Sequence, residues 1–275
     1  RGGGRFCNPA RGHETLAYFP YCGTEIMTIK NSLLETLCVE VAACTRLMNS
    51  EGLIDYSGHV SARLPGGNGL LVQSFEAPRA TLRPEQILMC DWEGVPLDDK
   101  EGLDPPREIY IHTEIMKTRS HVGAVAHFHA ETATLFSVVE DYPLIPVKNH
   151  ASRWAKGIPI HPEPSHINSR KLGEALSATL GDCHATLLRA HGVVITAETL
   201  PALLVDAIHF EENAKFLMRA KGLGQVKGLS TSEMQLFESR FNRVSHTKKL
   251  WKYFVTRGAE AGVIPREWLQ IILDG

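Results

Sequence analysis

The sequence predicts a single α/β domain with a central mixed, largely antiparallel sheet flanked by helices. Strand-like runs come in pairs, and a short turn rich in glycine or aspartate joins each pair, as in β-hairpins. Between and after these pairs, apolar residues recur at the spacing of amphipathic helices. The chain has 275 residues, of which 43% are hydrophobic, so it can bury a sizeable core. Hairpins with helices outside favour one mixed sheet.

The first expected element is a helix. Apolar side chains recur at helical spacing between Leu33 and Met48. We expect Asn31 or Ser32 to cap the beginning of this helix and Gly52 to end it.

The segment before this helix differs from the rest of the chain. Residues 1–5 are loop-like, and a fresh start comes at Met27. The segment has neither the apolar core of a signal peptide nor the acid-poor composition of a transit peptide. We therefore expect residues 1–26 to be a flexible N-terminal extension and residues 27–275 to form the main domain.

Two hairpins are expected next. The first joins strands at 59–64 and 70–73 through a Gly-Gly-Asn-Gly turn, and the second joins strands at 87–90 and 95–97 through Asp-Trp-Glu-Gly. Glycine and asparagine tolerate the backbone conformations that tight turns need. Both turns therefore favour antiparallel pairing of their strands.

The rest of the chain alternates helices with short strands. A helix opens at Pro105 and Pro106, because proline presets the backbone angle of a helix start. A proline-rich loop covers residues 143–164 and contains a short strand at 157–160. The remaining helices are expected at residues 131–139, 169–180, 201–221 and 231–254.

Two histidines follow a strand that is expected to be buried. Small and β-branched residues at 122–126 are typical of such a strand, and His127 and His129 come next. Side chains two residues apart on a strand point to the same side, so both imidazoles should face one site. His191 follows a second strand-like run, at 185–189, and precedes a glycine that favours a tight turn.

These three histidines are candidate metal ligands. Neutral imidazoles that converge from two strands can hold a divalent metal and leave coordination positions open for a substrate. The pattern therefore predicts a metalloenzyme. The alternative is a set of ordinary hydrogen-bonded histidines, since the chain contains 13 of them.

Glu108 is the candidate carboxylate for this site. It is expected in the first turn of the helix that opens at Pro105 and Pro106, where the helix dipole favours a negative charge. His112 is four residues further on and shares its face of the helix. The alternative is that Glu108 serves only as a partner of the helix dipole.

Composition excludes several classes of function. The formal net charge is −2 and the chain has no basic tract, so we expect no positively charged surface that would bind nucleic acid. No apolar run approaches the roughly 18 residues that cross a bilayer, so we expect no membrane association. The six cysteines are scattered without a Cys-x-x-Cys pair, which is typical of cytoplasmic proteins.

At residues 32–218 the sequence resembles the class II aldolase/adducin family. The resemblance is carried by residues 57–63, the Glu108 helix, residues 127–131 and residues 187–192. It implies that His127, His129 and His191 bind zinc or a similar ion. It also implies that Glu108 is the catalytic acid/base and reaches the metal. Residues 27–275 are then expected to form a class II aldolase-like catalytic domain.

Departures from the family pattern point away from sugar phosphates. His59 stands where sugar-phosphate aldolases have a phosphate-binding asparagine, and Pro106-Arg107 replaces paired serines. The phosphate turn has become residues 74–79, which include Phe75 and Glu76. Arginine suits planar carboxylates. The expected substrate-binding residues are Arg107, Arg79, His59 and Ser61. For each arginine the alternative is an ordinary surface side chain.

This pattern resembles the decarboxylase branch of the family, which acts on hydroxylated aromatic or pyridine carboxylates. It implies a metal-dependent decarboxylase of an aromatic dicarboxylate, such as 3-hydroxy-2-methylpyridine-4,5-dicarboxylate in vitamin B6 degradation. One divalent ion per subunit is expected, Mn²⁺ first and Zn²⁺ or another transition metal next, in a homotetramer. The metal would act as a Lewis acid while CO₂ leaves.

The expected proton chemistry centres on Glu108. It is the first choice as general acid/base, provided that burial raises its pKa. His112 is the second catalytic candidate, and His150 or His166 is a further source of support. The alternative functions are an aldolase or epimerase acting on a non-phosphorylated hydroxy-carbonyl substrate, a non-catalytic adducin-like binding module, and a mononuclear iron oxygenase.

Overall fold

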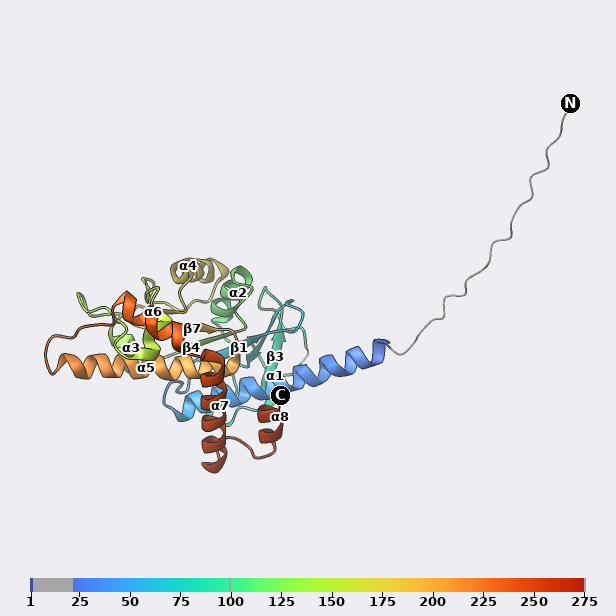
Figure 1. Ribbon diagram of the computed structural model, residues 1–275. Helices are drawn as coiled ribbons and strands as arrows, with labels where there is room; N and C mark the ends of the chain where they lie inside the picture. Colours follow the sequence, from blue (N-terminus) through green and yellow to red (C-terminus); the bar gives the residue numbers. More distant parts are fainter. Residues whose placement is uncertain (2–21, 99, 275) are drawn as a thin grey trace.

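A seven-stranded sheet forms the centre of the protein (Figure 1). The computed structural model describes residue 1, residues 22–98 and residues 100–274. The strand order is β3-β2-β1-β4-β7-β6-β5, and each neighbouring pair is antiparallel except β5 with β6. The strands are β1 (His59–Arg63), β2 (Leu70–Gln73), β3 (Ile87–Cys90), β4 (Ala124–Phe128), β5 (Ile160–His161), β6 (Ala185–Leu188) and β7 (Gly192–Ala197). The predicted mixed, largely antiparallel sheet is confirmed.

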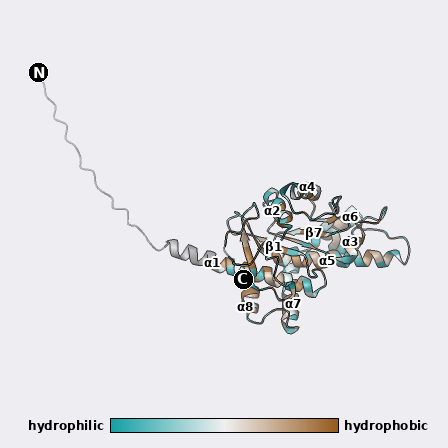
Figure 2. Ribbon diagram, turned by 180° about the vertical axis from the view of Figure 1, so that it is seen from behind, coloured by the Kyte–Doolittle hydropathy of each residue, from teal (hydrophilic) through white to brown (hydrophobic). Residues whose placement is uncertain are grey.

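Helices cover both faces of this sheet. In Figure 1, α2 and α4 lie on one side, and α1, α5 and α7 lie on the other. The helices are α1 (Cys22–Ser50), α2 (Ile109–Thr118), α3 (Glu131–Leu135), α4 (Arg170–Leu180), α5 (Leu200–Lys221), α6 (Thr231–Arg240), α7 (Arg243–Glu260) and α8 (Trp268–Asp274), with 3₁₀ turns η1 (Arg79–Thr81), η2 (Pro84–Gln86) and η3 (Asn149–Trp154). Teal and brown stretches alternate along α5 and α7 in Figure 2, as expected for helices with one face on the core.

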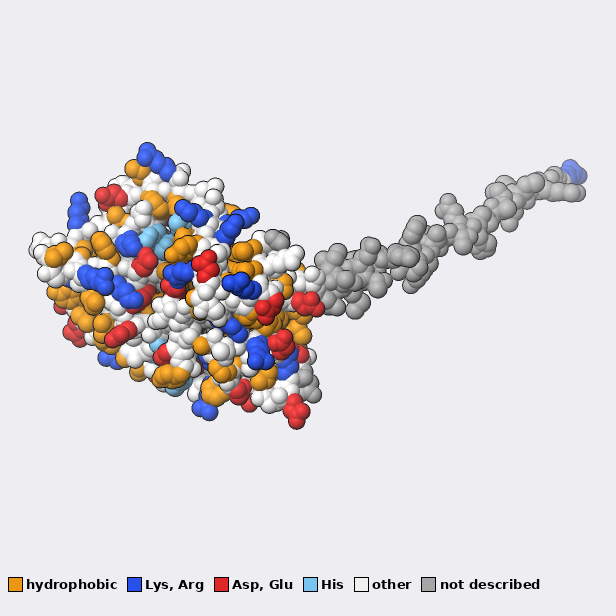
Figure 3. Space-filling view, turned by 90° about the horizontal axis from the view of Figure 1, so that it is seen from below, with side chains coloured by type: hydrophobic (Ala, Val, Ile, Leu, Met, Phe, Trp, Pro, Cys, Tyr) orange, Lys and Arg blue, Asp and Glu red, His pale blue; other side chains and the backbone are white. Residues whose placement is uncertain are grey.

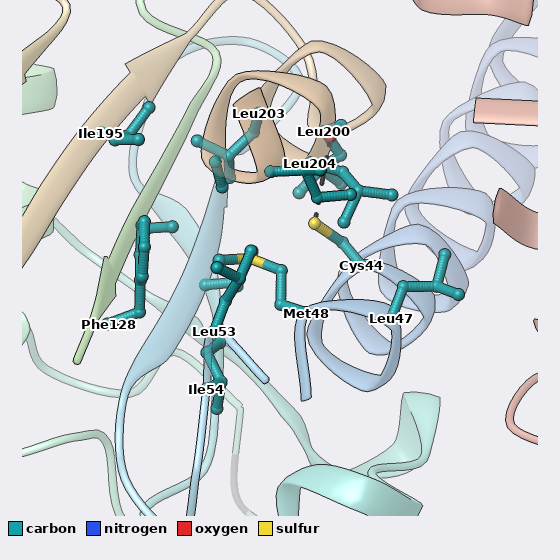
Figure 4. Close-up of a cluster of buried hydrophobic side chains, with 14 of the residues drawn as sticks. Cys44, Leu47, Met48, Leu53, Ile54, Phe128, Ile195, Leu200, Leu203 and Leu204 are labelled. Atoms are coloured by element: carbon teal, nitrogen blue, oxygen red, sulfur yellow. Dashed lines mark hydrogen bonds between the residues drawn. The ribbon is translucent and has the colours of Figure 1, made fainter. Parts of the chain in front are cut away.

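Two apolar cores hold these layers together. The larger one lies under α1 and α5, where Cys44 and Met48 of α1 meet Leu203 of α5 and Phe128 of β4 (Figure 4). The smaller one lies between the sheet and the helices α2 and α4. Burial of apolar surface on both faces holds the sheet in place, and the site described below lies at the ends of its central strands.

The expected hairpins are found, with one difference. β1 pairs with β2, and β6 pairs with β7, as predicted. After β3, however, the expected strand at 95–97 is reduced to an isolated bridge between Cys90 and Pro96. Proline has no backbone N–H to give to a ladder. Leu97 N still bonds to Met89 O, but Met89 N donates to the side chain of Asp98 instead of to a backbone carbonyl, so no regular strand forms. The short strand expected at 157–160 is found only at residues 160–161, as β5.

Two helix boundaries differ from the prediction. Helix α1 begins at Cys22 instead of Asn31 or Ser32, because no proline or glycine interrupts residues 24–31. Residues 2–21 of the expected N-terminal extension lie outside the described residues. Helix α3 ends at Leu135, after which the backbone continues to Val138 in i→i+3 turns.

The expected helix at 231–254 is broken into α6 and α7. The side chain of Asn242 accepts a hydrogen bond from Ser245 N and caps a new helix, which runs to Glu260. Helix α8 follows and has no counterpart in the prediction. In the described part of the chain, no helix is both long and apolar enough to cross a membrane.

Candidate metal centre

Three histidines meet at one end of the central strands. His127 is in β4, His129 follows that strand directly, and His191 lies in the turn between β6 and β7. One ring nitrogen from each lies within 4.8 Å of the others. Their ring centroids are 4.8–5.5 Å apart. The structure thus brings together the three imidazoles that strand alternation and the glycine turn suggested.

The backbone around His191 explains why the rings can come so close. Ala190 has a positive φ of 56°, which turns the chain sharply after β6. A Cβ atom on Gly192 would lie 2.6 Å from Phe128 O and 2.9 Å from Cδ2 of His129. Only glycine leaves room for β4 and β7 to approach at this point.

Glu108 adds a carboxylate to the three histidines. It lies at the N-cap of α2 instead of in the first turn, because residues 106–109 form a turn closed by a hydrogen bond from Ile109 N to Pro106 O before the helix begins. Its Oε2 atom lies 3.5 Å from Nε2 of His127 and 3.8 Å from Nε2 of His191. Its Oε1 atom accepts a hydrogen bond of 2.8 Å from Ile167 N, which fixes the carboxylate.

The ionisation state of this cluster differs from the expectation. Burial by itself raises the pKa of Glu108, but hydrogen bonding to His59 and to the amide N–H of Ile167 holds it well below its ordinary value. Glu108 is therefore a carboxylate at neutral pH, and the expected upward shift of its pKa is wrong. Burial lowers the pKa of His127 well below its ordinary value, so this imidazole is neutral.

The tautomer of His127 leaves a lone pair directed into the cluster. A carbonyl oxygen can only accept, so Nδ1 of His127 donates its proton to Val193 O at 3.1 Å. Nε2 of this fully buried ring is then an acceptor, and it has no hydrogen-bond partner among the described residues. It faces another acceptor, Oε2 of Glu108. Two buried acceptors in contact fit a cation between them, so the residues suit a divalent metal.

His59 and His112 form a second layer behind the cluster. Nε2 of His59 lies 3.7 Å from Oε2 of Glu108, and Nδ1 of His59 lies 2.6 Å from Nε2 of His112. The other ring nitrogen of His112 lies 2.6 Å from Oγ of Ser61. Both nitrogens of His112 are thus occupied, and His112 reaches the cluster only through His59.

The two expected substrate arginines have different surroundings. Arg79 is buried, and its guanidinium donates hydrogen bonds to the carbonyl oxygens of Gly58, Phe75 and Ala77. It therefore holds the loop residue Gly58, which directly precedes His59 at the beginning of β1. Arg107 is exposed, and its guanidinium lies 5.2 Å from the centre of the Phe75 ring.

The supporting histidines also separate. His166 is near the site, since its Nδ1 lies 3.8 Å from Oε1 of Glu108. His150 is not near the site. Its ring stacks on the ring of His209 of α5, with 3.9 Å between the ring centroids, in a separate histidine cluster. The suggestion that His150 supports Glu108 is therefore wrong.

Two contacts of the site leave no signal in the sequence. Asp55 Oδ1 lies 3.6 Å from Nδ1 of His129, and the amide of Ile167 holds Glu108. Asp55 belongs to the loop before β1, and Ile167 follows the proline-rich loop. Neither residue lies at a sequence spacing from the histidines that would indicate a contact.

A cavity of about 800 Å³ lies elsewhere and is bounded by α5, α7 and α8. Convergence of the donor groups, and not cavity size, therefore identifies the site. On the face shown in Figure 3, cationic and anionic side chains are interspersed, without a broad basic patch.

Known proteins resemble this chain in sequence and in fold. Residues 39–218 match the Class II Aldolase and Adducin N-terminal domain. The chain is 27% identical over 210 residues to a 3,4-dihydroxyphthalate decarboxylase of Arthrobacter keyseri, an alignment that covers 70% of this chain and 83% of the relative. It is 28% identical over 195 residues to a 5-methylthioribulose-1-phosphate/5-deoxyribulose-1-phosphate aldolase of Rhodospirillum rubrum, with 70% and 85% covered.

A solved structure shows the same fold. An aldolase II superfamily protein from Pseudomonas syringae superposes with a TM-score of 0.73 at 21% identity, over 84% of this chain and 94% of that chain. The fold and the family match therefore agree.

Proposed function

The chain belongs to the class II aldolase and adducin family, and on that premise we propose that it is a metal-dependent decarboxylase of a hydroxylated aromatic or pyridine dicarboxylate. One observation carries the proposal: the buried Nε2 lone pair of His127 lies 3.5 Å from the Glu108 carboxylate, and no described residue donates a hydrogen bond to this nitrogen. Such a pair suits a bound cation.

We assign His127, His129, His191 and Glu108 as the residues that would hold the ion. Neutral imidazoles with a carboxylate suit manganese, zinc, iron or cobalt, and Mn²⁺ is the first expectation. A bound divalent ion supplies Lewis acidity to the oxygen on which negative charge develops.

Glu108 is proposed to move the proton. Its ionised carboxylate takes the proton from a substrate hydroxyl beside the leaving carboxylate and delivers it to the ring carbon that bears this group, so the hydroxyl becomes a carbonyl. The bond between that carbon and the carboxylate then breaks, CO₂ leaves, and the electron pair moves onto the carbonyl oxygen, which becomes an oxyanion as the ring regains its aromaticity. The Glu108 carboxylate is regenerated without an outside acid.

Arg107 is proposed to bind the second carboxylate of the substrate. It is exposed at the residue before Glu108, and its planar guanidinium suits a carboxylate. Arg79 is committed to three backbone carbonyls, so we do not assign it this role. The dihydroxyphthalate decarboxylase relative supports a substrate with two carboxylates. Candidate substrates are 3,4-dihydroxyphthalate and 3-hydroxy-2-methylpyridine-4,5-dicarboxylate.

The second candidate function is an aldolase or epimerase that uses the same centre. The aldolase relative from Rhodospirillum rubrum favours it, because that protein matches this chain at a similar identity. Breaking a carbon–carbon bond next to an oxyanion is common to both reactions, so the centre alone does not separate them.

A substrate screen separates them. Protein loaded with Mn²⁺ is assayed for CO₂ release from both candidate dicarboxylates, and for carbonyl fragments from non-phosphorylated hydroxy-acids and from sugar phosphates. We expect CO₂ release with a dicarboxylate, and none with the His129→Ala variant. Carbonyl products without CO₂ would support the aldolase function, and no product from any of these compounds would contradict both.

A further inference from the structure

A buried chain of three side chains leads from the interior to the metal centre. Ser61 of β1, His112 of α2 and His59 of β1 are linked by two contacts of 2.6 Å, from Ser61 Oγ to His112 Nδ1 and from His112 Nε2 to His59 Nδ1. Their exposed fractions are 0%, 0% and 4%. We call these residues the Ser61–His112–His59 chain. Each contact needs one hydrogen, and a neutral imidazole carries one ring hydrogen. The two hydrogen bonds must therefore run the same way along the chain, with donors either from Ser61 toward His59 or from His59 toward Ser61.

The inner end of the chain selects one direction. If Ser61 donates to His112, then its only hydrogen is used, and His112 donates in turn to His59. In the reverse direction Ser61 accepts from His112, and the Ser61 hydroxyl must donate elsewhere. Among the described residues, no other hydrogen-bond partner of Ser61 Oγ is found, so the reverse direction leaves a buried donor unsatisfied.

The outer end of the chain selects the same direction. When His112 donates to Nδ1 of His59, the proton of His59 is on Nε2. That nitrogen faces Oε2 of Glu108, which is an acceptor. The reverse direction would place a lone pair of His59 against the carboxylate, where the lone pair of His127 already lies. Attraction replaces repulsion only if His59 carries Nε2–H.

We propose that Ser61 and His112 are positioning residues that hold His59 as the Nε2–H tautomer, so that it presents a fixed N–H donor to the metal centre. His59 is then not a metal ligand, although its ring nitrogen also lies within 4.8 Å of the ligand atoms of Glu108 and His127. The two neighbouring histidines have opposite roles. The Val193 carbonyl makes Nε2 of His127 an acceptor, and the chain makes Nε2 of His59 a donor.

The target of this donor rests on the proposed function. A substrate oxygen that becomes negative as the carbon–carbon bond breaks would accept from Nε2–H of His59. A preorganised donor stabilises such an oxygen because it needs no reorientation during the reaction. His59 therefore selects substrates with a hydroxyl oxygen beside the leaving carboxylate.

The tautomer is tested directly by NMR on metal-free protein labelled with ¹⁵N-histidine. Correlations between ring nitrogens and ring protons show which nitrogen carries the proton, and the His59→Asn spectrum assigns the signals. We expect Nε2–H for His59 in the wild type. We expect a mixture of tautomers in His112→Phe, which keeps a ring but breaks the chain. Nδ1–H in the wild type would overturn the proposal, and so would an unchanged tautomer in His112→Phe.

Matched serine variants test the inner end. Ser61→Ala should also shift the His59 tautomer, Ser61→Thr should restore it, and Ser177→Ala should leave it unchanged, because that buried serine bonds to Thr118 on α2. If Ser61→Ala and Ser177→Ala give the same His59 signals, Ser61 has no positioning role. Should a variant fail to fold, the wild-type spectrum still decides the tautomer.

Kinetics separate this inference from the proposed function. We expect kcat to fall about tenfold in Ser61→Ala and about a hundredfold in His59→Phe, with one metal ion per chain retained in both. Loss of metal in His59→Phe would make His59 a ligand and overturn the inference. If the wild type shows Nε2–H but releases no CO₂, the proposed function fails while the tautomer assignment stands.

Discussion

His59 lies directly opposite His127 in the antiparallel pairing of β1 with β4. Opposite residues in such a pair project to the same face of the sheet, and the two ring centroids are 5.1 Å apart. Both rings approach the same oxygen of Glu108, at 3.7 Å and 3.5 Å. Strand register therefore places His59, a hydrogen-bonding histidine, beside His127, a proposed metal ligand, and the proposed site depends on this pairing as much as on the proposed ligands.

The close approach at Gly192 gives the first prediction. In Gly192→Ala the new Cβ meets Phe128 O and the rings of both His129 and His127, so β4 and β7 must separate. We expect a loss of about 1–3 kcal/mol in the free energy of unfolding and weaker metal binding. Chemical denaturation and metal titration measure the two effects.

Gly222→Ala is the control for this variant. Gly222 ends α5 with a helical φ of −65°, and an added Cβ would lie 3.3 Å from Arg219 O, against 2.6 Å from Phe128 O at Gly192. The unfolding free energy should therefore change much less than in Gly192→Ala. Equal metal affinity in the wild type and Gly192→Ala would show that the close approach does not shape the centre.

Arg107 gives the second prediction. Lysine keeps the positive charge but cannot form the paired hydrogen bonds of a guanidinium. We expect Arg107→Lys to raise KM for a hydroxylated aromatic dicarboxylate about tenfold, with kcat nearly unchanged. The corresponding monocarboxylate is the control substrate, and its KM should stay the same. A similar rise for both substrates would contradict the assignment of Arg107 to the second carboxylate.

Much of this site could be predicted from the sequence because its geometry is local. His127 and His129 share a side because strand side chains alternate, and a glycine after His191 indicates a turn. The position of Glu108 at a helix start is similarly encoded by the two prolines before it. These relationships span only a few residues, so a pattern can reveal them.

The remaining parts depend on packing between distant segments. The contact between His112 and Ser61 requires α2 to lie on the sheet at one particular depth, and the amide of Ile167 reaches Glu108 from a loop. The pKa of Glu108 is lowered by neighbours that this packing brings to it, His59 and the amide of Ile167. Burial alone would raise that pKa, so the sequence suggested the opposite direction. The break between α6 and α7 was missed because Asn242 reveals itself as a cap only in the folded chain.

Glu40 gives the third prediction, which concerns stability and pH. It lies on α1 at the edge of the large cavity, and burial raises its pKa to about 7. The folded protein therefore holds this proton more tightly than the unfolded chain, whose glutamate has an ordinary pKa of 4.5. The contribution of Glu40 to stability is most favourable below pH 4.5, declines between pH 4.5 and about 7, and stays low above that range.

Glu40→Gln removes this dependence. At pH 8 we expect the variant to be more stable than the wild type by about 1–3 kcal/mol, and the difference should shrink toward pH 4.5. Urea denaturation across this range measures it. The control is Glu174→Gln on an exposed part of α4, with an expected change below about 0.5 kcal/mol. Parallel stability curves for the wild type and Glu40→Gln would contradict the prediction.

Metal content tests the central claim most directly. The wild type, His127→Ala and His209→Ala are loaded with Mn²⁺, freed of excess metal and analysed for ions per chain. His209 belongs to the separate histidine cluster and serves as the matched control. We expect one tightly bound ion in the wild type and in His209→Ala, and its loss in His127→Ala. A wild type without bound metal, or a His127→Ala variant that keeps its ion, would contradict a metal centre at His127, His129, His191 and Glu108.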